Sequence, residues 1–158
     1  MQNIPLNWKK AFMPQNSTAT DLNEGVYQSV PVHFDDLDIY HMVYHGKYPS
    51  LFERALTAYW TRIGITLAEL HQVVRTLQLT YEAPITGVGE VAVHFFIDHV
   101  GRTSYRYGFR ILSQDRSLVH ATGTRVQVNL NPETLRPAPF DAQALALAQP
   151  LLTSAARL

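Results

Sequence analysis

The sequence has no cysteine among its 158 residues. It therefore has no disulfide framework, no thiolate nucleophile and no cysteine-ligated metal. Charge is also scarce: charged residues make up 16% of the chain, and 13 basic residues balance 13 acidic ones. A nucleic-acid-binding surface needs an excess of Lys and Arg to displace counterions. The zero net charge therefore argues against a nucleic-acid partner.

Long apolar segments are missing as well. No apolar run reaches membrane-spanning length, so we predict no membrane span. Residues 1–10 have no apolar stretch after their charges and are not typical of a secretory signal, so we expect a cytoplasmic protein. Hydrophobic residues nevertheless make up 46% of the chain, which is enough for one globular domain with one core.

The periodicity of apolar residues divides the chain. Residues 1–25 are interrupted by prolines and a polar run, and we interpret them as an N-terminal arm. Apolar residues alternate from 26 to 34, which predicts a strand. From 44 to 63 the period becomes helical, with Pro49 near the start and Gly64 after the last apolar residue.

The remainder is mostly of strand type. Alternation predicts four more strands, at 73–81, 90–97, 104–111 and 118–130. The connections carry turn residues and are short, which favours antiparallel pairing of sequence neighbours. Asp141 is expected to cap a short helix over 142–148 in a C-terminal tail, residues 140–158. The pattern predicts an α+β fold in which about five strands cover one long buried helix.

Motifs around the start of that helix resemble a known family. They are Asp36-x-Asp38, Val43-Tyr44-His45, Tyr48, Phe52-Glu53-Arg54-Ala55, Pro84-x-x-Gly87-x-Gly89-Glu90, Gly101-Arg102-Thr103-Ser104 and Leu135-Arg136-Pro137-x-Pro139. Together they resemble the hydroxybenzoyl-CoA thioesterase branch of the hot-dog superfamily, and within it the bacterial acyl-CoA thioesterases associated with the Tol-Pal cluster. The resemblance implies a hot-dog domain over residues 26–139, with a curved sheet wrapped around a central helix, in which some strands pair in parallel or out of sequence order. It also implies a homodimer that pairs again into a homotetramer.

A carboxylate ahead of a helix N-terminus suits thioester hydrolysis. The first N–H groups of a helix lack internal partners and can polarise a carbonyl. A nearby carboxylate can attack that carbonyl or deprotonate a water that attacks it. The resemblance implies that Asp38 is the catalytic carboxylate and that backbone N–H groups around Tyr44 and His45 polarise the thioester. Asp38 is either nucleophile or general base, or it merely caps a turn. Asp36 is expected to bond loop N–H groups, and neighbouring carboxylates to raise one another's pKa.

Two bulky residues follow the catalytic acid. The relatives usually carry small residues, often Gly, where this chain has Tyr40 and His41. Either the loop keeps an ordinary backbone conformation, or these substrate-binding residues make the acyl pocket narrower. His41 and His45 have the spacing of helical metal ligands, but no Glu lies between them, and we predict no metal.

Further residues complete the expected site. Tyr48 is expected in the core or the pocket wall, and either the second strand or the Gly87 and Gly89 region of the opposing subunit is expected to close the site. Arg102 either contacts CoA phosphates, which a guanidinium suits, or is a solvated turn charge. Glu53 is the alternative acid, although structural pairing with Arg or Lys is favoured.

The expected activity is hydrolysis of acyl-CoA or acyl-carrier-protein thioesters to free acid and thiol. No cofactor is expected, because a thioester is already activated. Two alternatives stay open. The first is a hot-dog protein that binds acyl thioesters with little turnover, which Tyr40 and His41 suggest. The second and weaker is a hydratase or dehydratase, which needs a His–Asp or His–Glu pair that the sequence does not match.

Overall fold

The computed structural model describes residues 23–157, so most of the predicted arm (1–25) lies outside the described residues. The described part forms one five-stranded sheet in the order β1-β3-β4-β5-β2. The elements are β1 (Val26–Val32), α1 (Tyr48–Arg62), β2 (Gln72–Tyr81), β3 (Gly89–Val100), β4 (Ser104–Ser113), β5 (Val119–Asn129) and α2 (Ala142–Ala148). Each predicted strand and helix is present, with shifts of a few residues at the ends.

The strands pair antiparallel throughout, but not always with their sequence neighbours. β3, β4 and β5 pair in chain order through tight turns. β2 pairs instead with β5, and β1 pairs with β3. Pairing of sequence neighbours, which the short connections favoured, is therefore wrong for β2 and β3, because residues 82–88 cross the end of the sheet between them. The out-of-order pairing that the hot-dog resemblance implies is found instead, and it is antiparallel. On the way, Thr86 forms a bridge with Met42, so the crossing segment lies against the loop that precedes α1.

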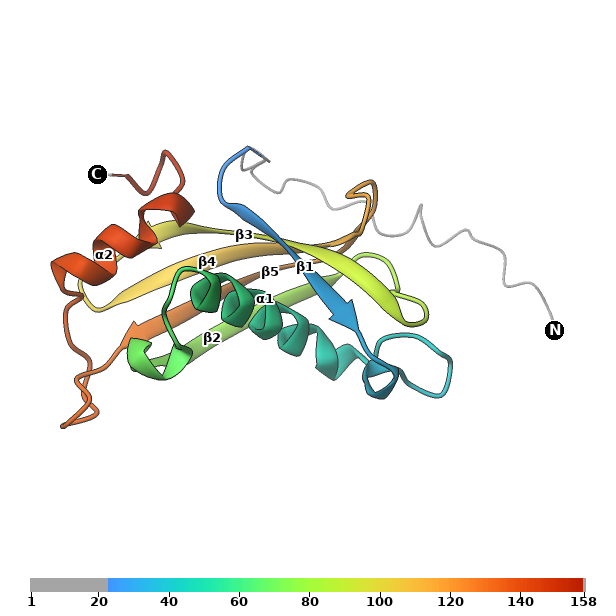
Figure 1. Cartoon of the computed structure of the whole chain (residues 1–158), viewed down its shortest axis with the longest axis horizontal. Coiled ribbons are helices and arrows are strands. Elements are labelled where there is room, and N and C mark those ends of the chain that lie inside the picture. Colours follow the sequence, from blue (N-terminus) through green and yellow to red (C-terminus); the bar gives the residue numbers. More distant parts are fainter. Residues whose placement is uncertain (1–22, 158) are drawn as a thin grey trace.

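α1 packs across one face of the curved sheet (Figure 1). Its buried stripe is the predicted one: Tyr48, Leu51, Phe52, Ala55, Leu56, Tyr59 and Trp60. The ring of Phe52 stacks on that of Phe109 in β4, with centroids 4.1 Å apart. The helix begins at Tyr48 rather than 44, because His45–Lys47 wind as a tighter 3₁₀ turn. This arrangement confirms the predicted α+β hot-dog fold.

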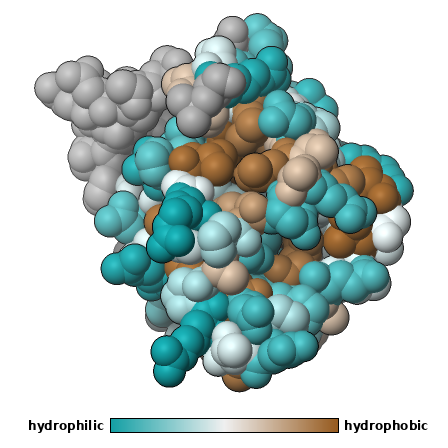
Figure 2. All heavy atoms as spheres, turned by 90° about the vertical axis from the view of Figure 1, so that its left-hand side faces the viewer, coloured by the Kyte–Doolittle hydropathy of each residue, from teal (hydrophilic) through white to brown (hydrophobic). Residues whose placement is uncertain are grey.

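α2 lies at one end of the sheet (Figure 1). Asp141 caps it as predicted, since its Oδ1 accepts a hydrogen bond from the N–H of Ala144 at 2.7 Å. Figure 2 views the molecule from this end and shows hydrophobic side chains in separate patches among hydrophilic ones. Across residues 23–157, no helix has both the length and the apolar character needed to span a membrane.

Candidate active site

The loop between β1 and α1 holds Asp36 in a buried ion pair. Its carboxylate receives two guanidinium N–H groups from Arg54, at 2.6 and 2.7 Å, and the N–H of His33 at 2.8 Å. The hydrogen bond from Arg54 lowers the pKa of Asp36 below 3.8, although burial acts in the opposite direction. The expected increase in pKa between neighbouring acids is therefore wrong for Asp36, because its nearest charged neighbour is a cation.

Asp38 is held by one of its two carboxylate oxygens. Oδ1 accepts the N–H groups of Tyr40 at 2.8 Å and of Met42 at 3.2 Å. The backbone closes the same turn, because the N–H of Asp38 donates to the carbonyl of Met42 at 2.7 Å. No hydrogen-bond donor from residues 23–157 reaches Oδ2. Asp38 thus caps the turn with one oxygen and keeps the other available.

The turn places His41 in the left-handed backbone region, with φ of 58°. This region favours glycine and strains other residues by about 1–2 kcal/mol. The expectation that the loop could keep an ordinary backbone conformation is therefore wrong. Glycine at this position would fit the same turn without the steric cost. The crossing segment 82–88 of the same chain holds the strained turn in place, since the carbonyl of His41 accepts the N–H of Gly87 at 2.9 Å.

A cavity of about 320 Å³ opens beside Asp38. It is lined by Asp38, Met42, Val43, His45, Tyr48, Tyr81, Glu82, Ala83 and Pro84. Three predicted site residues, Asp38, His45 and Tyr48, are thus brought together. Burial raises the pKa of Tyr48 above 10.0, and the negative charge of Asp38 acts in the same direction. Tyr40 and His41 are exposed and do not line the cavity.

The start of the helical segment offers one unused N–H group of the two that were expected. The N–H of Tyr44 donates to the carbonyl of Asp36 at 2.8 Å and is already engaged. The N–H of His45 has no acceptor among residues 23–157. Tyr44 lies outside the cavity lining, and its ring packs over Gly46 and against the His45 ring.

Two other predicted residues lie elsewhere. The carboxylate of Glu53 accepts the guanidinium of Arg125 at 2.5 Å, which is the structural pairing that the sequence favoured. Arg102 lies in the turn after β3, whereas the loop around Asp38 lies beside the other end of that strand (Figure 1). A strand of this length spans about 40 Å, so a single chain does not bring Arg102 to Asp38.

Sequence reasoning missed Tyr81 and Glu82 as cavity residues. Tyr81 ends β2, and its hydroxyl donates to the carbonyl of His45 at 2.9 Å. The available signal was its place at the end of a predicted strand just ahead of the Pro84 motif. Within the described residues, one group with metal-ligand chemistry was found, His33, Asp35 and Asp36, whose ligand atoms lie within 4.8 Å. Asp36 already binds Arg54 there.

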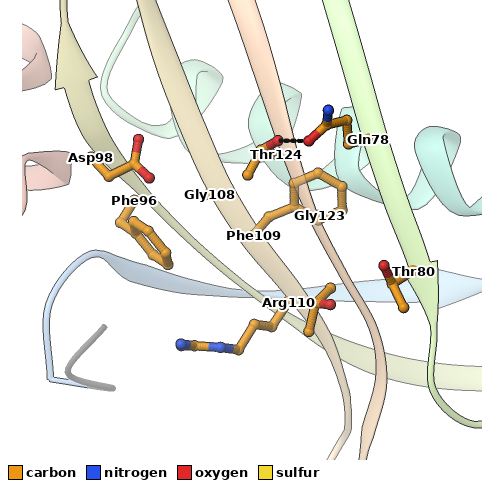
Figure 3. Close-up of a pocket in the computed structure, with 10 residues that line it drawn as sticks. Gln78, Thr80, Phe96, Asp98, Gly108, Phe109, Arg110, Gly123 and Thr124 are labelled. Atoms are coloured by element: carbon orange, nitrogen blue, oxygen red, sulfur yellow. Dashed lines mark hydrogen bonds between the residues drawn. The ribbon is translucent and has the colours of Figure 1, made fainter. Parts of the chain in front are cut away.

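A second hollow, of about 280 Å³, lies on the sheet face opposite α1 (Figure 3). Its lining comprises Gln78, Thr80, Phe96, Asp98, Gly108, Phe109, Arg110, Thr122, Gly123 and Thr124. None of the predicted catalytic residues is among them. Asp98 is ion-paired with Arg106 at 2.7 Å, and Arg110 donates to the buried His94 at 3.1 Å. The cavity beside Asp38 is therefore the better candidate for thioester chemistry.

Comparison with known proteins identifies the family. The Thioesterase superfamily matches residues 40–120, and the chain belongs to that family. A thioesterase from Thermus thermophilus, complexed with coenzyme A and Zn, is 31% identical, with a TM-score of 0.69 over 79% of this chain and 92% of that one. The comparison with curated proteins found no match.

Two further solved structures share the fold at lower identity. A protein from Pseudomonas aeruginosa is 21% identical, with a TM-score of 0.73 over 82% of this chain and 93% of that one. A DHNA-CoA thioesterase from Staphylococcus aureus is 19% identical, with a TM-score of 0.67 over 78% and 86%. The narrower resemblance to the hydroxybenzoyl-CoA and Tol-Pal-associated branch stays a prediction.

Proposed function

We propose that the protein hydrolyses acyl-CoA thioesters, with the Asp38 carboxylate as the reactive group. The observation that carries this proposal is the asymmetry of that carboxylate: two N–H groups hold Oδ1, while Oδ2 receives no donor from residues 23–157. A group that is already oriented loses little freedom on reaching the transition state. Family membership and the CoA-bound Thermus neighbour support a thioester of CoA as substrate.

Two routes use the same geometry. The substrate carbonyl accepts the N–H of His45, which stabilises negative charge as it develops on oxygen. In the nucleophilic route, Oδ2 of Asp38 bonds to the acyl carbon, the C–S bond breaks, and CoA leaves as a thiolate that takes a proton from solvent. Water then hydrolyses the mixed anhydride and regenerates Asp38. In the general-base route, Oδ2 takes a proton from the water that attacks the carbonyl, the C–S bond of the resulting tetrahedral intermediate breaks, and the departing CoA thiolate takes up that proton, which regenerates Asp38.

Subunit pairing along β2 fits this proposal. β2 is an edge strand that exposes Val73, Val74 and Leu77, and an exposed edge is a template for another strand. Antiparallel pairing of two β2 strands across a two-fold axis would give the expected homodimer, which pairs further into a tetramer. In such a dimer the partner's sheet would run in the opposite direction, so that Arg102 of the partner subunit lies at the end of the sheet where this chain carries Asp38. A CoA phosphate could then meet that guanidinium.

The test is thiol release from short, long and aromatic acyl-CoAs. Asp38→Asn keeps an acceptor oxygen for the turn but removes both the nucleophile and the base. We expect kcat to fall by at least about 100-fold, the lower range for a lost acid–base group. Asp35→Asn, at an exposed acid of the same loop, is the matched control and should stay within about twofold of wild type. Comparable turnover in Asp38→Asn and wild type would refute the proposal.

Acyl-thioester binding with little turnover is the second candidate. The bulky Tyr40–His41 pair favours it, because the family that the sequence resembles carries small residues there. The left-handed φ of His41 also favours it, because a glycine would adopt this φ without strain. Tight calorimetric binding of CoA and carrier-protein thioesters without any thiol release would support this reading. Hydration of crotonyl-CoA would instead favour a hydratase.

A further inference from the structure

Tyr81 connects the edge strand β2 to the start of the helical segment. Its hydroxyl donates to the carbonyl oxygen of His45 at 2.9 Å, across 36 residues of sequence. The ring also meets that of Tyr48 edge to face, with centroids 5.0 Å apart, and forms part of the cavity wall beside Asp38. No other hydrogen bond in the described part of the chain joins β2 to His45–Lys47.

The planarity of the peptide unit extends the effect of this hydrogen bond. The carbonyl of His45 and the N–H of Gly46 belong to one planar unit and point in opposite directions. A donor that fixes the carbonyl therefore fixes the N–H. The preceding unit, which carries the N–H of His45, is fixed by the N–H of Lys47 donating to the carbonyl of Tyr44 at 2.8 Å. Each of the two units around His45 is thus held by one hydrogen bond.

These two units carry N–H groups that the rest of the described chain leaves unused. Neither His45 nor Gly46 has an acceptor for its N–H among residues 23–157. Both lie at the start of a helical segment, where N–H groups carry partial positive charge. A donor group contributes to a transition state only when its direction is set in advance. The direction of the second group depends on the Tyr81 hydroxyl.

We infer that Tyr81 is a positioning residue, which orients the His45–Gly46 peptide unit so that the N–H of Gly46 joins the N–H of His45 as a second donor to the thioester carbonyl beside Asp38. This inference rests on the proposed function and deepens it. Tyr81 acts through its hydroxyl and through the backbone, and it takes no part in bond making or proton transfer. Because Tyr81 ends β2, it also links the strand proposed for subunit pairing to the reacting atoms.

The first test is the kinetics of Tyr81→Phe. Phenylalanine keeps the ring and its contact with Tyr48 but removes the donor. With the best acyl-CoA substrate, we expect kcat to fall about 3- to 10-fold, which is the range of one lost hydrogen bond, while KM stays within about twofold. A purely structural residue would reduce the fraction of folded enzyme and would be rescued by assay at lower temperature, whereas this loss should persist.

Tyr105→Phe is the matched control. The Tyr105 hydroxyl donates to Oε1 of Gln72 at 2.7 Å, so this change also removes a tyrosine hydrogen bond to β2, but at the opposite end of the strand. Its side chain is more deeply buried than that of Tyr81, so its stability loss should be at least as large. We expect its kcat to match wild type. Equal kcat losses in the two variants would overturn the inference.

A second readout does not depend on turnover. Loss of the Tyr81–His45 hydrogen bond should speed amide hydrogen exchange at Lys47, whose N–H donates to the carbonyl of Tyr44 and closes the turn over His45–Lys47. We expect this in Tyr81→Phe but not in Tyr105→Phe. Unchanged exchange and unchanged kcat in Tyr81→Phe would overturn the inference while Asp38-dependent hydrolysis stood. If wild type released no thiol, the proposed function would fail, and the exchange experiment alone would decide whether Tyr81 orders the turn.

Discussion

Removing Arg54 is expected to destabilise the protein more than removing both members of its ion pair. Asp36 has no exposed surface, and without Arg54 its charge keeps only the N–H of His33. Breaking a buried pair costs about 3–5 kcal/mol. The side chain of Arg54 is 29% exposed, so water screens part of the interaction and reduces this cost. We predict a loss of about 2–4 kcal/mol for Arg54→Met.

Denaturant unfolding in a double-mutant cycle measures this loss. The cycle compares Arg54→Met, Asp36→Asn and the double variant, and methionine keeps much of the apolar stem of the arginine. The double variant should be more stable than Arg54→Met, because the buried carboxylate has become a neutral amide. If the free energy of unfolding of Arg54→Met lay within about 0.5 kcal/mol of the wild-type value, the burial argument would be refuted.

The same pair predicts a pH dependence. The pKa of Asp36 in the folded protein lies below the unfolded value of 3.8, so the contribution of the pair is fully present above 3.8 and is lost as the pH falls through the lower folded value. In Arg54→Met, burial without the cation raises that pKa instead. As the pH falls towards 4, protonation of Asp36 therefore relieves the destabilisation of Arg54→Met, whereas Asp36 of the wild type stays ionised. The stability gap between the two should therefore be smaller at about pH 4 than at about pH 7.

Two more predictions follow from the sheet. Gly123→Ala should destabilise by about 1–3 kcal/mol and more than Gly108→Ala, since its Cβ would lie 2.6 Å from the backbone oxygen of Gln78. At Gly108 the obstacle is the ring of Phe96, a side chain that borders the hollow in Figure 3 and can shift more easily than backbone; a larger drop in melting temperature for Gly108→Ala would contradict this. Leu77→Lys on the β2 edge should shift the protein towards monomer in sedimentation with an unchanged circular dichroism spectrum, and an unchanged oligomer would place the interface elsewhere.

The secondary structure could be predicted because each signal is local. The stripe from Tyr48 to Trp60, the alternation in β3 and β4 and the cap at Asp141 depend on residues a few positions apart. Pairing of β2 with β5 could not be predicted in this way. Local turn chemistry in residues 82–88 resembles that of a hairpin, whereas the segment crosses the end of the sheet.

The candidate site was predictable in its residue types and not in its contacts. Asp38, His45 and Tyr48 do line one cavity. The lowered pKa of Asp36 depends on Arg54, which lies 18 positions away and on another element. The Tyr81 hydrogen bond likewise joins positions that only the tertiary structure brings together.

The contrast between Asp36 and Asp38 explains how the loop keeps a reactive group available. A carboxylate with an unbonded oxygen stabilises the fold less than one with all its oxygens bonded. Asp36 supplies that missing stability on one side, by tying the loop to α1 through Arg54 and by accepting the N–H of Tyr44 on its carbonyl. On the other side, the hydrogen bond from Gly87 holds the turn. With both flanks fixed, the free oxygen of Asp38 can stay on the cavity wall without collapse of the loop around it.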